Sequence, residues 1–225
     1  MHIPDGFLNP LISILMFILT LISLIWAWKG TKQTLPRSFP PLIALCSSII
    51  LIAQIIEFPV AGGASTWHIM GGTFVSMILG PHATIISMTI VLLIQTSLLG
   101  EGGISAFGAN VFNMAVISGL SFYIVKVLVG SSFSIKRFAT SLFIATWMSS
   151  ILTAVATGIE LGFYPMVAPI GSMMVTLPTM LFFYVPSGLV EAAITTPLVL
   201  ALLKIIPKTL KGINMLQVNS LEKKS

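Results

Sequence analysis

Long apolar stretches separated by short polar turns run through most of this 225-residue chain. A helix needs about 20 apolar residues to cross a bilayer, and backbone groups inside lipid must form hydrogen bonds within their own segment. The pattern therefore predicts membrane-spanning helices. We expect them over Phe7–Trp28, Pro40–Ile56, His68–Leu79, Ala83–Leu99, Asn110–Val129 and Phe138–Gly158.

A final apolar stretch, from Met166 to Ile206, is interrupted by prolines, which remove backbone donors and bend or end helices. We expect a broken or re-entrant piece over Met166–Tyr184 and one full span near Pro186–Ile206. The predicted fold class is an all-α integral membrane protein with seven transmembrane helices. The interrupting residues are Pro169, Pro178, Pro186 and Pro197.

Composition agrees with a lipid environment, because 56% of the residues are hydrophobic and only 8% are charged. Soluble domains carry about 25% charged residues, so this chain has too few charges to coat a water-facing surface. We expect a multi-pass protein of the cell membrane, surrounded by the lipid bilayer. The formal charge of +5 then reports topology and does not indicate a nucleic-acid partner.

The placement of charges predicts an orientation, since basic residues mark cytoplasmic loops. Seven crossings from an external N-terminus put the basic clusters inside and the acidic residues outside, and they leave the C-terminus in the cytoplasm. Residues 1–207 form a single transmembrane domain in this interpretation, followed by a short basic tail, 208–225. The inner cluster contains Lys29, Lys32, Arg37, Lys136, Arg137 and Lys204, and the outer residues are Asp5, Glu57, Glu101 and Glu160.

The chain starts MHIPDGF, and this start offers a metal chelate. The amine of Met1, the amide nitrogen of His2 and the His2 imidazole are spaced to surround one ion through small, nearly unstrained rings. The imidazole of His68 is a candidate for the fourth corner. Tetragonal nitrogen donors suit Ni(II) or Cu(II), and imidazole suits related divalent ions. The alternative is an N-terminus in which His2 has no role.

Turn-forming loops on the same side would support such a site. Pro4 and Gly6 make the first turn stiff and tightly bent. Asn110 and Asn113 are one helical turn apart and share a face; they either orient ligands and loop backbones or hold neighbouring helices together. The residues expected to support the site are Asp5, Gly62, Gly63, Ser65, Glu101, Asn110 and Asn113.

Glu191 is an ionisable residue within the last apolar stretch. Such a group at membrane depth is costly and is usually functional or paired. The sequence does not identify its partner.

Taken together, the motifs resemble the substrate-binding membrane component, of the CbiM/NikM type, of energy-coupling-factor (ECF) transporters for nickel and cobalt. The resemblance extends to about Ile206. One departure is Tyr184, which stands where the family usually has a histidine, seven residues before Glu191. The motifs are MHIPDGFL, FPVAGGAS with His68 three residues on, ILGP, GEGG, GANVFNM and SGLVEAAIT.

This resemblance implies seven helices, an external N-terminus and metal ligands from Met1, His2 and His68. It also implies a transporter subunit and not an enzyme, with Ni(II) or Co(II) as the transported substrate and no organic cofactor. The expected partners are a transmembrane coupling subunit, cytoplasmic ATPase subunits and a small accessory membrane subunit. The absence of a G-x-x-x-x-G-K-[ST] motif from the sequence agrees with ATP hydrolysis by a partner.

Two other classes of function stay open at the level of sequence. An autonomous ion-coupled metal carrier or channel would need relays of ionisable groups within the membrane. A membrane metalloenzyme would need an activating base beside an open metal position, and Glu57 or Glu101 is the candidate base.

Overall fold

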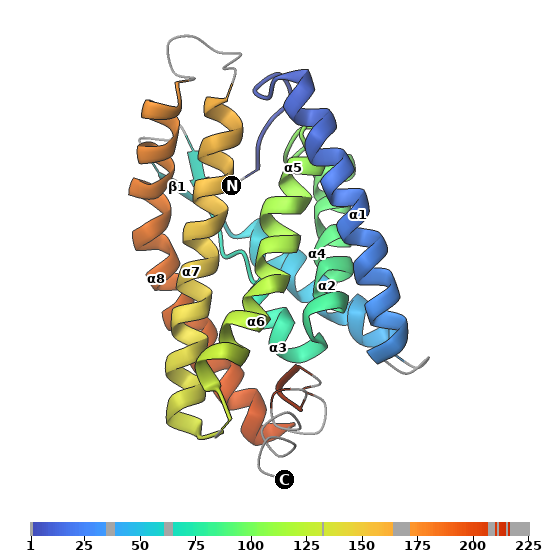
Figure 1. Ribbon diagram of the computed structural model, residues 1–225, viewed down its shortest axis with the longest axis vertical. Coiled ribbons are helices and arrows are strands. Elements are labelled where there is room, and N and C mark those ends of the chain that lie inside the picture. The colour runs from blue at the N-terminus through green and yellow to red at the C-terminus, as the bar shows by residue number, and fades with distance from the viewer. Residues whose placement is uncertain are drawn as a thin grey trace.

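The computed structural model describes residues 2–34, 39–60, 65–131, 133–163, 172–206, 210, 212–214 and 216, and for Phe58–Val60 and Ser65–Trp67 it describes the backbone alone. The described residues form an elongated helical bundle, and its long helices run along the long axis of the bundle (Figure 1). Met1, Gly62, Gly63 and most of the tail 208–225 lie outside the described residues.

Five helices are long and apolar enough to cross a membrane within the described ranges, which confirms a multi-pass membrane protein. Two apolar helices are shorter: α2 (Pro40–Ile55) has 16 residues and α3 (Gly72–Leu79) has 8. The count of seven spans therefore stays a prediction. The long spans are α1 (Pro10–Thr34), α4 (Pro81–Ile94) with its π-helical extension η2 (Gln95–Leu99), the run α5 (Phe107–Val111), η3 (Phe112–Val116) and α6 (Ile117–Val129), α7 (Ile135–Gly162), and α8 (Met173–Ile205).

The last helix corrects the sequence prediction. α8 is one continuous helix of 33 residues with Pro178, Pro186 and Pro197 inside it, so a break before Tyr184 is wrong for the described residues. At 1.5 Å per residue it is about 50 Å long. Proline has no backbone N–H that could be left without a partner. A break in the helix, in contrast, would expose N–H and C=O groups to lipid at a high cost in free energy. The helix therefore continues through its prolines.

Small residues hold α8 against α7. A Cβ atom added to Gly188 would lie 2.7 Å from the Cβ of Ser150, and one added to Gly158 would lie 2.8 Å from the Cα of Leu177. The hydroxyl of Thr176 donates to the carbonyl of Gly158 at 2.6 Å. Close approach through small residues is how helices associate where lipid competes for every apolar surface.

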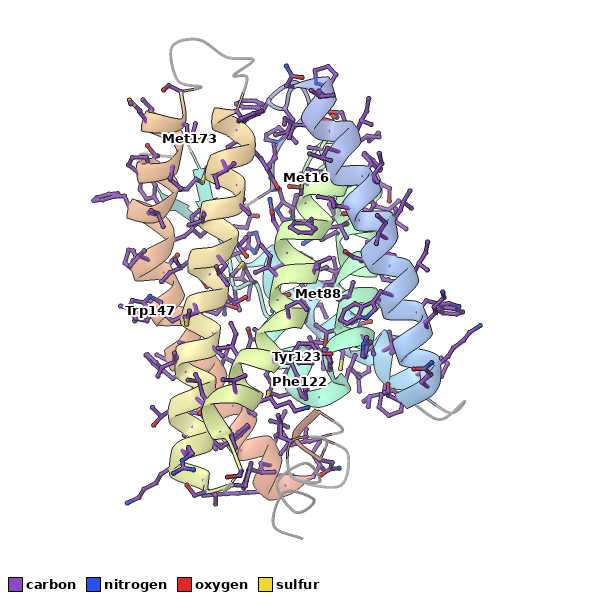
Figure 2. All side chains as sticks on the ribbon, in the orientation of Figure 1. Met16, Met88, Phe122, Tyr123, Trp147 and Met173 are labelled. Atoms are coloured by element: carbon purple, nitrogen blue, oxygen red, sulfur yellow. The ribbon has the colours of Figure 1, made fainter. Side chains whose placement is uncertain are left out.

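The core lies between the helices, and the outer faces are also apolar. Met88 is buried near the middle of the bundle and Phe122 lower down, and Met16 is a buried residue of α1 (Figure 2). Leu11, Ile18 and many other large apolar side chains of α1 and α8 are exposed. A water-soluble protein would not leave so continuous an apolar surface uncovered, so these faces suit lipid.

Charges separate along the bundle. α1 ends, α7 begins and α8 ends at the pole drawn at the bottom (Figure 1), which carries the basic residues near those ends, Lys32, Lys136 and Lys204. The opposite pole holds the N-terminal turn and the end of α7, where Glu160 lies.

A two-stranded antiparallel ribbon, β1 (Phe58–Val60) and β2 (Ser65–Trp67), joins α2 to α3, with Phe58 opposite Trp67. This ribbon departs from an all-α chain but lies outside the spans. Its register brings the residues that flank it, Glu57 and His68, to the same end of the ribbon. Beyond it, every residue of the short helix α3 except the partly buried Phe74 is buried.

The glycine contact between α7 and α8 is testable. We expect Gly188→Leu to destabilise the bundle by about 1–3 kcal/mol, the usual cost of overpacking. Cys46 is the one cysteine of the chain and is buried, so its reaction with a maleimide dye during heating reports unfolding. Ala193→Leu, at an exposed position of the same helix, is the matched control. Equal melting temperatures for the two variants would contradict the close packing.

Candidate metal centre

The first residues turn back into the bundle instead of extending from it (Figure 1). The N–H of Ile3 donates to Asn110 Oδ1 at 2.8 Å, and Asn110 Nδ2 donates to the carbonyl of Ile3 at 3.1 Å. The N–H of Gly103 donates to that same carbonyl at 2.9 Å. Asn110 is 1% exposed, so a buried amide on α5 pairs with both backbone groups of Ile3 and fixes the chain next to His2.

Asp5 makes a second attachment at the surface. Its carboxylate accepts from the Ser105 hydroxyl at 2.6 Å, the Ser105 N–H at 2.8 Å and the Ile104 N–H at 3.1 Å. These bonds, those of Ser105 first, lower the pKa of Asp5. A Cβ atom at Gly103 would overlap the backbone nitrogen of Asp5, so the loop needs glycine there to let the N-terminal turn approach.

A chain of buried amides fixes the His2 ring. The carbonyl of Met70 accepts from Gln54 Nε2 at 2.8 Å, and Gln54 Oε1 accepts from Gln95 Nε2 at 2.8 Å. Gln95 Oε1 lies 3.1 Å from His2 Nε2. A backbone carbonyl can only accept, so it orients Gln54, which orients Gln95, whose oxygen requires a donor from His2. The proton of His2 is thereby assigned to Nε2, and Nδ1 carries the lone pair.

His68 faces this ring. The two imidazoles stack with centroids 5.0 Å apart and an interplanar angle of 27°. His68 Nδ1 lies 3.2 Å from the carbonyl of Ile69, an acceptor that assigns the proton to Nδ1 and makes Nε2 the basic nitrogen. His68 is 2% exposed.

Both imidazoles are neutral in this environment. Burial, and to a smaller degree the positive N-terminal amine, lower the pKa of His2 to about 3. Burial, the same amine and His2 lower the pKa of His68 well below its usual range. A neutral imidazole is the form that binds metal, so the pair is ready to accept an ion without first losing protons.

Glu191 supports the loop that follows His68, and this is the partner that the sequence did not identify. Its Oε1 accepts from the N–H of Gly71 at 2.9 Å, and its Oε2 lies 3.4 Å from the Ser150 hydroxyl. The carboxylate of α8 thus holds the start of α3, and with it the backbone next to His68, against α7.

Glu57 joins the site, although sequence reasoning named it only as an outer acidic residue and as a candidate base in the metalloenzyme alternative, not as a ligand. One ligand atom from each of His2, Glu57 and His68 lies within 4.8 Å of the others. Two atoms bound to one ion at about 2.1 Å are at most about 4.2 Å apart, so a small closing movement would let all three bind together. Gly62 and Gly63 were the sequence signal that could have predicted this contact. A hairpin turn at these glycines pairs the residues on either side of it and so brings Glu57 next to His68.

The other expected residues lie at varying distances from this cluster. Asn113 donates to Glu160 Oε2 at 2.7 Å and to the Thr157 hydroxyl at 3.2 Å, so its amide joins η3 to α7. Burial, then the charge of Glu57, raises the pKa of Glu101, but Glu101 is not a member of the cluster. Tyr184 is buried in the main core, and Ser65 lies in β2.

Known proteins match this chain along most of its length. The family model described as CbiM, cobalt uptake substrate-specific transmembrane region, matches residues 2–209. A relative from Archaeoglobus fulgidus, provisionally named fused nickel transport protein NikMN, is 36% identical over 205 residues, covering 88% of this chain and 64% of the relative. The cobalt transport protein CbiM of Ruminiclostridium cellulolyticum is 29% identical over 226 residues, covering 95% of this chain and 87% of the relative.

Solved structures agree with the fold. A crystal structure of a transition metal transporter superposes with a TM-score of 0.82 at 31% identity and covers 100% of both chains. A truncated transition metal transporter gives 0.81 at 32% identity, covering 91% of this chain and 99% of that one. The chain spans less than two thirds of the fused relative from A. fulgidus.

The series of hydrogen-bonded amides predicts that Gln95, which is not itself a proposed ligand, affects metal binding by orienting His2. We expect Gln95→Leu to weaken Ni(II) binding by about 10–100-fold, the usual cost of removing a partner that orients a ligand. Calorimetric titration of purified protein measures this. Gln33→Leu, the same substitution at an exposed position of α1, should leave the affinity unchanged. If the two variants bind equally well, the amide chain does not position His2.

Proposed function

Because the chain belongs to the family of the CbiM cobalt uptake substrate-specific transmembrane region, we propose that it is the substrate-binding membrane subunit of an ECF-type transporter. It captures Ni(II) or Co(II) at the outer face of the cell membrane for uptake driven by ATP. The chain itself carries out no covalent chemistry. The convergence of His2 and His68, each with a defined basic nitrogen, is the observation on which the proposal rests.

The proposed ligands are four nitrogens. With its proton on Nε2, His2 offers Nδ1, which forms a six-membered ring with its own amide nitrogen. The amine of Met1 closes a five-membered ring with the same amide. His68 Nε2 takes the fourth position. The two fused rings require the N-terminal turn to stay docked, which is the role of Asn110 and Asp5 in this proposal.

Orientation follows from the charges. The pole with Lys32, Lys136 and Lys204 is the cytoplasmic side under the positive-inside rule, so the metal site opens outward. In this arrangement α2 and α3 complete seven crossings or partial crossings. The exposed apolar faces are available to lipid, to the transmembrane coupling subunit and to the small accessory subunit, while the cytoplasmic pole meets the ATPase subunits.

Two features favour a capture subunit over an autonomous ion-coupled carrier or channel. Glu191 is bonded to Gly71 and Ser150, and Glu160 is bonded to Asn113. Among the described residues, both buried carboxylates of the spans therefore have structural partners, which does not suit a relay that must exchange protons or ions.

Extending the N-terminus tests the proposal directly. We expect one glycine added ahead of Met1 to weaken Ni(II) and Co(II) binding by more than the roughly 10–100-fold that loss of an orienting residue costs, because it moves the terminal amine away from the His2 amide, which breaks the five-membered ring between them, and it changes no side chain. A glycine added after Ser225 is the control. Undiminished affinity of the first variant would refute the role of the terminal amine.

The number of protons released on binding tests the ligand set. Since the imidazoles are already neutral, the displaced protons come from the His2 amide and from the amine, whose usual pKa is about 7.7–8.0. Between pH 6 and 7 we expect about two protons per ion, so affinity should rise about 100-fold per pH unit. Calorimetry in buffers of different ionisation enthalpy counts them. Release of no protons would exclude the amide as a ligand.

A further inference from the structure

A plane of four nitrogens would leave the positions above and below the ion open, and a further ligand atom near the two histidines could fill one of them. The Glu57 carboxylate belongs to the same cluster as His2 and His68, with one ligand atom of each within 4.8 Å of the others. Among the residues that the structure describes, the other acidic side chain near the site, Glu101, is not part of that cluster. Glu57 is therefore the carboxylate placed to reach a bound ion.

The fold holds Glu57 in this position. It directly precedes β1, and the pairing of Phe58 with Trp67 makes Glu57 and His68 neighbours across the open end of the ribbon. The loop after His68 is tied to α8 through Gly71 and Glu191. Metal ligation through Glu57 therefore needs only side-chain rotation or a small closing of the ribbon.

We propose that Glu57 is an oxygen ligand that adds a fifth bond to the captured ion and thereby favours Co(II) over Ni(II). This inference rests on the proposed function, because it assumes that the nitrogen site binds metal. It assigns to this chain a selectivity element that the four nitrogens alone would not supply.

Charge supports the assignment. A divalent ion bound by one deprotonated amide leaves one net positive charge in a largely buried site, and an uncompensated buried charge is costly. The Glu57 carboxylate cancels it, so that the complex is neutral. Neither the imidazoles nor the amine can contribute that negative charge.

Electronic structure explains the expected preference. Planar nitrogen coordination suits Ni(II), and an axial oxygen adds little to an ion that already favours the plane. Co(II) gains less from planarity and accepts a fifth ligand readily. Removing the carboxylate should therefore affect Co(II) more than Ni(II).

The test compares Glu57→Gln with Glu222→Gln, a matched change in the C-terminal tail. We expect Glu57→Gln to lower the ratio of Co(II) to Ni(II) affinity by about tenfold or more, within the range for altered metal environments, and Glu222→Gln to leave it unchanged. An unchanged ratio in Glu57→Gln would overturn the inference. Cys46 labelling during heating verifies that each variant is folded.

X-ray absorption of the unmodified protein gives an independent readout. We expect cobalt-loaded wild-type protein to have five nitrogen or oxygen neighbours, falling to four in Glu57→Gln. Four neighbours in the wild type would refute the role of Glu57 while leaving the nitrogen site intact. Failure of the wild type to bind either metal would overturn both this inference and the proposed function.

Discussion

The two-way hydrogen bonding between Asn110 and the backbone of Ile3 is the constraint on which the rest of the site depends. A polypeptide terminus is ordinarily the most mobile part of a fold, and here it must keep His2 beside a ring 66 residues further along the chain. Ile3 exchanges both of its backbone hydrogen bonds with one buried amide, so the segment can leave only by exposing unsatisfied polar groups. Asp5 adds a second attachment through Ser105, in the loop that precedes α5.

Buried side-chain amides then determine which nitrogen of His2 carries the proton. The Met70 carbonyl, Gln54 and Gln95 form a directional series of hydrogen bonds, and its direction selects which nitrogen of His2 bears the proton. In a buried environment such bonds are stronger than in water, and an unpaired member would be costly. The series begins at the backbone two residues after His68 and ends at the ring of His2. It therefore links the main chain beside one histidine to the side chain of the other.

The helical frame could be predicted largely from hydrophobic pattern, since lipid leaves the backbone few alternatives. Spans such as α1 and α7 agree with the predicted ranges to within a few residues at most ends. α8 was the exception, because proline signals a break in water but is tolerated where neighbouring helices and lipid favour continuity. The glycines at Gly158 and Gly188 have a role that only the position of the facing helix reveals.

The sequence by itself determined that the protein is surrounded by lipid, and it identified the two histidines as candidate ligands and the separation of basic from acidic ends, because these follow from composition and local order. The tertiary structure alone decided which polar groups meet. Asn110 and Asn113 look equivalent on one helical face, yet one docks the N-terminal segment and the other joins α7. Glu191 bonds to Gly71, and Glu57 lies beside the two histidines. Both are contacts between segments far apart in the chain, and local sequence patterns do not encode the distances between such segments.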